Sequence, residues 1–118
     1  MKYLCLIYDD EKRAAARSKA EHEALFGEYM AFTKSIRESG QHVAGEPLEP
    51  TSTATTVRVR DGRVSTTDGP FAETKEQLGG FFLIEAKDMD DACAIAARFP
   101  PARLGTIEVR PVQELHHS

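Results

Sequence analysis

The sequence has no run of apolar residues long enough to cross a membrane, and it carries no excess of positive charge. A membrane-spanning helix needs about 20 consecutive apolar residues. The N-terminal apolar run, residues 3–8, is too short even for a signal-peptide core, and three acidic residues follow it directly. The formal net charge of -4 argues against a nucleic-acid binder, because phosphate contacts need clustered Lys and Arg. We therefore expect a cytoplasmic protein that binds neither membranes nor nucleic acids.

The chain also contains few residues of the kinds that carry covalent or metal chemistry. Cys5 and Cys93 have no metal-type spacing, so both are expected to be reduced core residues. The four histidines show no i, i+4 pairing, and we favour a solvated charge run over a cation site for residues 9–11. No Gly-rich phosphate loop, serine nucleophile elbow or Cys-His pair is recognisable. We expect neither a metal nor a cofactor.

The composition is that of an ordinary globular domain. A length of 118 residues matches one domain, and such a chain can bury about two-thirds of its unfolded surface. The apolar fraction of 41% and the charged fraction of 29% are typical of such proteins. We expect residues 1–118 to form a single domain with one core.

Periodicity predicts a strand and a long helix in the first forty residues. Residues 2–8 form a strand that is apolar on both faces, and residues 9–17 form a mobile or weakly helical connection. Ser18 and Glu21 have the spacing of a capping box, which opens a helix that ends near Gly40. The apolar stripe of this helix consists of Leu25, Tyr29, Phe32 and Ile36, widened by Phe26, Met30 and Thr33.

The rest of the chain is predicted to contain a loop, a hairpin, two strands and a helix. Residues 45–54 form an irregular loop, and Asp61-Gly62 between alternating segments is the strongest short hairpin signal. A second strand with two apolar faces covers residues 80–86, and a last strand covers residues 106–112. Between these strands Asp88 caps a helix whose buried face is Ala92, Ile95, Ala96 and Phe99. The hairpin arginines, Arg58, Arg60 and Arg63, are expected to form a solvated face rather than a phosphate patch.

The order of these elements predicts an α+β fold. Two β-α-β units with a mostly antiparallel sheet are the ferredoxin-like plan, here with an extra hairpin. Two helices cover only one face of the sheet, yet the strands at 2–8 and 80–86 are apolar on both faces. The second face therefore needs a partner, and a second copy of the chain is the simplest one. We expect a homodimer.

Residues 68–80 are the most informative stretch of the chain. The residue types of Asp68-Gly69-Pro70 are typical of a turn, and Phe71 is expected to anchor this turn in the core. Residues 72–78 are good helix formers and predict a short helical turn. The closing Gly79-Gly80 allows a backbone or a ligand to approach closely. Because a simple connection does not need this density of charge, we interpret the segment as a binding site.

This stretch resembles the signature of the DGPF-domain branch of the YCII-related family. The likeness includes Asp68-Gly69-Pro70-Phe71, residues 73–86, the opening strand and residues 108–112, and thus covers essentially the whole chain. The resemblance implies a ferredoxin-like fold paired into a dimeric α/β barrel, with a cleft at or near the dimer interface. It also implies small enzymes with a His-Asp acid–base pair, although no histidine here matches that pair by motif. Relatives are often associated with extracytoplasmic-function sigma factors.

Each candidate catalytic residue has a structural alternative. Asp68 either caps the turn or serves as a general acid or base. Glu73 and Lys75 either position an anionic substrate or join Glu76 in a surface ion-pair network that fixes the loop.

The candidate binding residues also allow more than one interpretation. Tyr8 ends the first strand, where its hydroxyl either points into a cleft or packs at the rim. His22 borders the helix stripe, where a partly buried structural role is favoured over an acid–base role. Phe71 and Glu76 complete the set. His42 is expected to be exposed in a loop, and His116 and His117 belong to the terminus.

Two functions follow from these residues. The first is a small enzyme that performs acid–base chemistry on an unidentified small organic molecule, which requires Asp68 to face an enclosed apolar pocket. The second is a non-catalytic binding or regulatory module, which requires Glu73 and Lys75 to project from an open surface. For this module the resemblance implies a sigma factor as partner.

Overall fold

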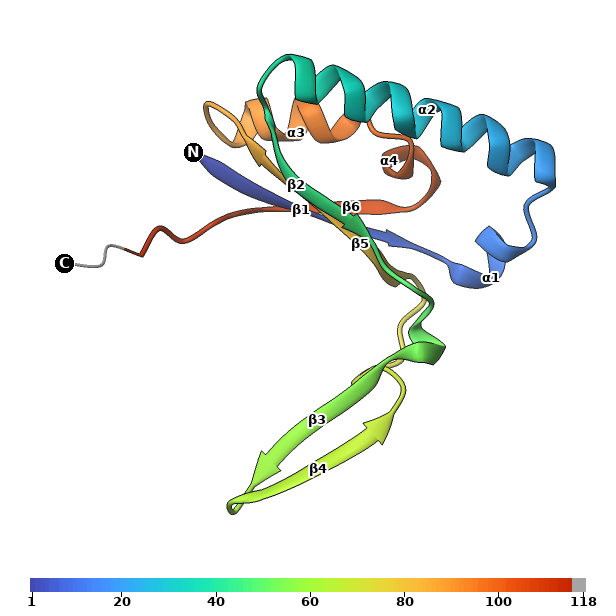
Figure 1. The fold of residues 1–118 in the computed structure, drawn as a ribbon, viewed down its shortest axis with the longest axis vertical. Helices are drawn as coiled ribbons and strands as arrows, with labels where there is room; N and C mark the ends of the chain where they lie inside the picture. Colours follow the sequence, from blue (N-terminus) through green and yellow to red (C-terminus); the bar gives the residue numbers. More distant parts are fainter. Residues whose placement is uncertain (116–118) are drawn as a thin grey trace.

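Four antiparallel strands form the main sheet of the computed structural model, which describes residues 1–115 (Figure 1). Its order is β2-β5-β1-β6. The strands are β1 (Lys2–Asp9), β2 (His42–Pro47), β5 (Gln77–Glu85) and β6 (Thr106–Pro111). A helix follows β1 and another follows β5, so the predicted ferredoxin-like α+β fold is confirmed.

Two helices cover one face of this sheet, α2 (Lys19–Glu38) and α3 (Met89–Ala97) (Figure 1). The predicted capping box is present at Ser18 and Glu21, and the Asp88 carboxylate accepts the Asp91 amide proton at 2.8 Å. Shorter helical turns are α1 (Glu11–Ala15), η1 (Thr51–Thr53) and α4 (Pro101–Leu104). None of the helices in residues 1–115 combines the length and apolar character that a membrane span requires.

Aromatic rings form the centre of the core between the sheet and the helices. Phe99 lies 4.7 Å from Phe82 and 4.8 Å from Phe32, measured between ring centroids. Each such pair stabilises the fold by about 0.5–1.5 kcal/mol beyond the area that it buries. The helix stripe is narrower than predicted, because Phe26 is 66% exposed and Met30 also faces solvent, whereas Thr33 is buried as expected. Of the two cysteines, Cys5 is buried as expected, whereas the prediction for Cys93 is wrong because its side chain is exposed.

The opposite face of the sheet is apolar at its centre, and no helix of residues 1–115 covers it. Leu4 pairs with Leu83 and Leu6 pairs with Phe81, whereas Cys5 and the residues in register with it point to the helices. These four side chains are half-buried, and Glu108 and Arg110 of β6 lie beside them on the same face. The prediction that the two central strands are apolar on both faces is therefore confirmed, while the homodimer inferred from it stays a prediction.

The predicted hairpin projects from the main sheet as a separate arm (Figure 1). It consists of β3 (Thr55–Arg60) and β4 (Arg63–Asp68), joined by Asp61 and Gly62 with φ angles of 52° and 73°. Two positive φ values are the mark of a type I′ turn. The arm raises the radius of gyration to 16.5 Å, compared with about 13 Å for a compact chain of about 100 residues.

Three local predictions are wrong or incomplete. The expected loop 45–54 begins as strand β2, because Gly45 serves close packing rather than a turn: a Cβ there would lie 2.6 Å from the Phe82 ring. The helical turn expected at 72–78 is absent, since this segment is irregular and then enters β5 at Gln77. The connection 9–17 is helical at α1, as predicted, but Asp10 caps it by accepting amide protons of Lys12 and Arg13.

Candidate functional site

The segment 68–80 passes the end of the sheet at which β1 and β2 finish and β5 begins. Strand residues alternate between the two faces of a sheet, so neighbouring residues of this end serve different hollows. Tyr8 and Leu78 pair on the open face, whereas Ile7 and Gly80 pair on the helix face. One hollow lies on each side.

We call the hollow on the open side the outer hollow. Its volume is about 560 Å³. Its wall combines apolar side chains with hydroxyl groups from β1, η1, the base of the arm and the signature segment. The lining residues that matter for ligand contact are Tyr8, Leu48, Thr51, Phe71, Gln77 and Leu78.

We call the hollow on the helix side the inner cavity. Its volume is about 200 Å³, and it lies between the sheet end, α2 and the start of α4. Phe99 and Ile7 supply apolar wall, and Asp9 and Tyr29 bring polar side chains to it. Both glycines of Gly79-Gly80 also line it.

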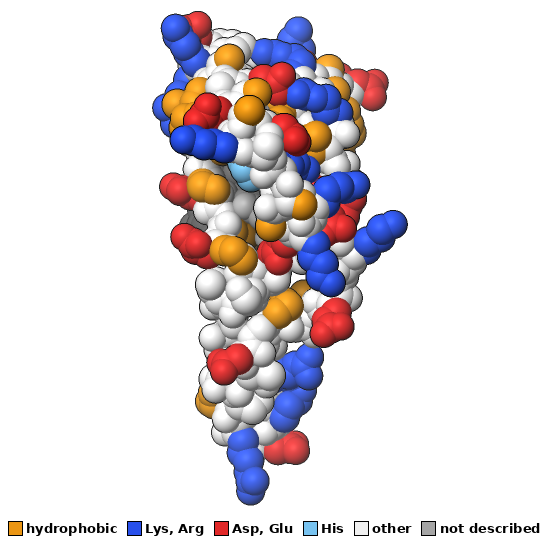
Figure 2. Space-filling view, turned by 90° about the vertical axis from the view of Figure 1, so that its right-hand side faces the viewer, with side chains coloured by type: hydrophobic (Ala, Val, Ile, Leu, Met, Phe, Trp, Pro, Cys, Tyr) orange, Lys and Arg blue, Asp and Glu red, His pale blue; other side chains and the backbone are white. Residues whose placement is uncertain are grey.

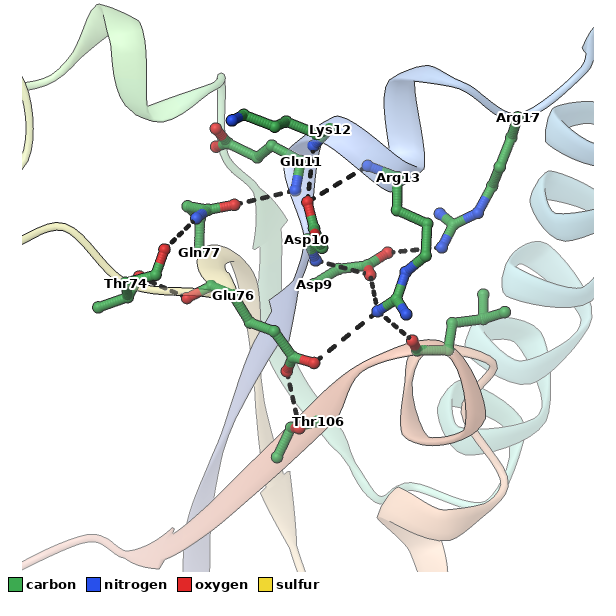
Figure 3. A network of polar contacts seen from close by, with 11 residues as sticks. Asp9, Asp10, Glu11, Lys12, Arg13, Arg17, Thr74, Glu76, Gln77 and Thr106 are labelled. Carbon is green, nitrogen blue, oxygen red and sulfur yellow. Dashed lines mark hydrogen bonds and ion pairs between the residues drawn. The ribbon is translucent and has the colours of Figure 1, made fainter.

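A polar network holds the end of β1 in place beside these hollows (Figure 3). Asp9 accepts a hydrogen bond from the Arg17 guanidinium at 2.9 Å. Arg13 donates to the Leu104 carbonyl at 3.1 Å and lies 3.6 Å from Asp9 and 3.8 Å from Glu76. The side chains of Asp9, Arg13 and Arg17 therefore hold the end of β1 together with α1 and α4.

A second set of contacts, of which Figure 3 shows those among Glu11, Gln77 and Thr74, fixes the start of β5. The Glu11 carboxylate accepts the amide and hydroxyl protons of Thr51, both at 2.8 Å. The Glu11 amide donates to the Gln77 side chain at 2.9 Å, and Gln77 donates to the Thr74 carbonyl at 2.6 Å. The acidic run 9–11 is thus a structural cluster and not the solvated run that we favoured. Within residues 1–115, no group of His, Cys, Asp and Glu is arranged to hold a metal ion.

Asp68 lies at the end of β4, exposed and outside the walls of both hollows. Backbone groups hold the turn that follows it: the Gly69 amide donates to the Ala54 carbonyl at 2.7 Å, and Thr56 donates to the Gly69 carbonyl at 2.8 Å. Gly69 has a φ of 104°, which explains the glycine of the motif. The acid–base role of Asp68 stays a prediction.

Phe71 does not anchor the turn in the core, as we had expected. Its side chain is 81% exposed and forms part of the outer hollow. The physical reason is the bond between Gly69 and Ala54, which fastens the turn to the base of the arm, beyond the packed layers.

The charged residues of the segment separate into two groups. Glu73 and Lys75 are exposed and form no ion pair with another residue of 1–115, so the predicted surface network is absent. Glu76 is half-buried, accepts the Thr106 hydroxyl proton at 2.8 Å and lies near Arg13. Its contacts are structural.

The predicted environments of His22 and His42 are both wrong. His22 is exposed on the first turns of α2, which extend beyond the strands (Figure 1), so the partly buried role is wrong. His42 was expected in an exposed loop but is half-buried in β2, with its ring 6.0 Å from that of Phe82. Burial, and secondarily the charge of Arg37, lowers the His42 pKa. His116 and His117 lie outside the described residues.

Sequence reasoning missed the polar lining of the inner cavity. Asp9 was assigned to a solvated run, and Tyr29 was counted only as part of the helix stripe. A usable signal existed for Asp9: it is the first charged residue after a strand with two apolar faces, so it must meet the edge of the core. Tyr29 offered none, because a half-buried tyrosine in a stripe packs in the same pattern as a core residue.

Comparisons with known proteins agree with this architecture. The family model of the YCII-related domain matches residues 1–116. An uncharacterised protein of Rhizobium meliloti (strain 1021) is 40% identical over 114 residues, which is 95% of this chain and 92% of that protein.

A solved structure with a similar fold is 5-chloro-2-hydroxyhydroquinone dehydrochlorinase (TftG) from Burkholderia phenoliruptrix AC1100, in complex with 2,5-dihydroxybenzoquinone. The TM-score is 0.51, with 96% of this chain and 94% of the other covered, at 16% sequence identity. At that identity, the likeness establishes the fold.

Proposed function

The chain belongs to the YCII-related family, and from this premise we propose that it binds a small organic molecule in the outer hollow. One observation carries the proposal: the signature residues 70–72 and 74, with Gln77 and Leu78, form a wall of a hollow of about 560 Å³. Ligand sites in proteins typically measure about 300–1,000 Å³ and have an apolar lining with a few placed polar groups.

The lining indicates the kind of molecule that fits. Leu48, Phe71 and Leu78 offer apolar contact. The Tyr8 hydroxyl group can donate or accept, and the Thr51 hydroxyl oxygen, whose proton goes to Glu11, can accept. Among the lining residues only Glu49 carries a charge. A mainly apolar molecule with one or two polar groups suits this wall. The structural neighbour from Burkholderia phenoliruptrix is a complex with 2,5-dihydroxybenzoquinone. That ligand supports a small single-ring molecule, although its four oxygens make it more polar than this wall favours.

Acid–base chemistry in this site is the finer part of the proposal. Asp68 would transfer the proton, and Glu73 and Lys75 would position the substrate. Because these three side chains are exposed, such a reaction needs further cover, for which the predicted second subunit is the candidate.

The alternative of a non-catalytic binding module has one observation in its favour. Glu73 and Lys75 project from an open surface, which is the placement that this alternative requires. Neither relative reported above is described as a partner of a sigma factor, so that association, like the cytoplasmic location, stays a prediction.

A matched pair of phenylalanine variants tests the outer hollow. The probe is 8-anilinonaphthalene-1-sulfonate, whose fluorescence rises in apolar sites and meets no tryptophan signal in this chain. Phe71→Ala should weaken binding about tenfold, because a ligand that covers half of that ring gains about 1–1.5 kcal/mol. Phe26→Ala removes another exposed ring, 66% accessible compared with 81% for Phe71, from α2 outside this hollow, and should leave binding unchanged. Equal affinities of the two variants would reject the outer hollow as the site.

Asp68→Asn separates the enzyme from the module. If a reaction is found, an enzyme should lose turnover in this variant while it keeps its fold and its ligand affinity. Unchanged turnover would confine Asp68 to the turn.

A further inference from the structure

The inner cavity is lined by features that core packing alone does not require. It lies on the opposite side of the sheet end from the outer hollow, with Ile7 and Phe99 as apolar wall. Phe99 is buried in the core cluster, whereas Glu46 and Gly79 at the other side of the cavity are exposed. The cavity therefore reaches from the aromatic core to the surface.

Glycine is present at positions 79 and 80 of the signature for different structural reasons. A Cβ on Gly80 would lie 3.0 Å from the Glu46 carbonyl oxygen and 3.4 Å from the Pro47 Cα atom, so close approach of β2 requires that glycine. A Cβ on Gly79 would have only the Ile7 carbonyl oxygen near it, at 4.0 Å, and Gly79 does not have a positive φ. Neither packing nor backbone conformation requires glycine at 79. What its missing side chain does is leave room beside the cavity.

Asp9 and Tyr29 supply complementary hydrogen-bonding groups. The Asp9 carboxylate accepts from the Asp10 amide at 2.8 Å through one oxygen and from Arg17 at 2.9 Å through the other. Since a carboxylate has about four acceptor positions, it can accept further hydrogen bonds. The Tyr29 hydroxyl makes no hydrogen bond to any residue of 1–115. Tyrosine is protonated at neutral pH and so can donate; burial and, after it, the charge of Glu46 raise the pKa of Tyr29 further in the same direction.

We propose that the inner cavity is a second binding site, for a single-ring organic molecule that carries a hydroxyl group and a carbonyl or second hydroxyl group. The ring fills the space against Ile7 and Phe99, and a cavity of about 150 Å³ is enough to hold benzene, compared with about 200 Å³ here. The hydroxyl group of the ligand donates to Asp9, and its other oxygen accepts from Tyr29. This site is separate from the outer hollow and does not depend on it.

The test uses the full chain and a set of three probes. 3-Hydroxybenzaldehyde carries both polar groups, 3-methoxybenzaldehyde has its donor blocked, and benzaldehyde lacks the hydroxyl group altogether. Binding is followed by two-dimensional NMR of backbone amides, with Gly79 and Gly80 reporting on the inner cavity and Thr55 and Ala72 on the outer hollow.

We expect 3-hydroxybenzaldehyde to shift the amides of Gly79 and Gly80, and to bind at least threefold more tightly than the two other probes. Tyr29→Phe should weaken its binding about three- to tenfold, the value of one hydrogen bond. Tyr8→Phe is the matched control, because it removes a hydroxyl group from the outer hollow only. The probe series needs no variant, so the test stands even if Tyr29→Phe is poorly folded.

Three results would overturn the proposal. They are shifts confined to Thr55 and Ala72, equal affinities for the three probes, and no binding at millimolar concentration, which would leave the cavity to water. Since Phe71→Ala should not alter the shifts at Gly79 and Gly80, failure of the inner cavity and failure of the outer hollow are distinguishable.

Discussion

The valines of the hairpin arm should decide how strongly two copies of the chain associate. Val57, Val59 and Val64 share one face of the arm, because Val59 is directly opposite Val64 and Val57 lies two residues along. They are 55–69% exposed. Basic residues occupy the other face, and Figure 2 shows Lys and Arg side chains along the tapering end of the molecule. A two-stranded hairpin alone is only marginally stable in water, so this apolar face is a natural contact for the predicted dimer.

The size of the effect follows from the exposed fractions. Replacing each valine by threonine keeps a β-branched side chain suited to a strand but exchanges a methyl group for a hydroxyl group. A buried methylene is worth about 0.8 kcal/mol, and 55–69% of each valine remains to be buried. The three changes should therefore cost about 1.5 kcal/mol per arm, or about 3 kcal/mol for the two arms of a symmetric dimer. The dissociation constant should rise about 100-fold.

Sedimentation equilibrium at micromolar concentration measures this constant. The control is Arg58→Gln with Arg63→Gln, which changes the opposite face of the same strands and should shift the constant less than tenfold. A wild-type chain that is monomeric under these conditions would remove the dimer altogether. A dimer whose constant is the same in the valine triple variant would show that the arm is not its interface, and would leave the open face of the sheet as the candidate.

Further predictions concern stability and the thiols. Arg17→Gln should lower the free energy of unfolding by about 1–3 kcal/mol in urea titrations, because Arg17 and Asp9 are only 13% and 23% exposed. The control Arg103→Gln breaks a half-exposed pair with Glu28 and should cost less than about 1 kcal/mol. Equal losses in the two variants would contradict this reasoning. In the native protein one thiol, Cys93, should react with a chromogenic disulfide reagent below pH 10, because burial raises the pKa of Cys5 to about 11; two fast-reacting thiols would refute it. The raised pKa of Cys5 should also lower the free energy of unfolding by on the order of 2 kcal/mol as pH rises from about 9 to 11, because the unfolded chain loses this proton at lower pH than the folded chain. A Cys5→Ala variant should lack that fall.

Features fixed by neighbours in sequence were predictable. The Ser18–Glu21 box and the Asp61-Gly62 turn each depend on backbone groups within a few residues, and both are present. Strand β2 was missed because its glycine is explained by the Phe82 ring, which lies 37 positions away in the sequence. In the sequence alone, a pattern of Gly and Pro that forms a loop cannot be told from one in which the glycine makes room for an aromatic ring such as that of Phe82.

The candidate site was predicted at the right segment but with the wrong side chains. Charge density drew attention to Asp68, Glu73 and Lys75, which are exposed. The polar groups that line or support the hollows have partners far along the chain, as Glu11 has in Thr51 and Gln77. No local pattern encodes such contacts, whereas local charge is visible at once and most often marks a solvated surface.

The position of the signature segment explains why one continuous motif joins a turn, charged residues and a double glycine. Its first part is fastened to the arm and builds the wall of the outer hollow, and its last part crosses to the helix side. The crossing requires the irregular pairing between β1 and β5 at Ile7 and Tyr8, where Tyr8 is opposite Leu78 and Ile7 is opposite Gly80. Gly79 is the residue left over, and it is the one whose glycine neither packing nor φ requires. Gly80 is explained by the close approach of β2, whereas Gly79 is better explained by the space that it leaves beside the inner cavity than by the turn at the start of the segment.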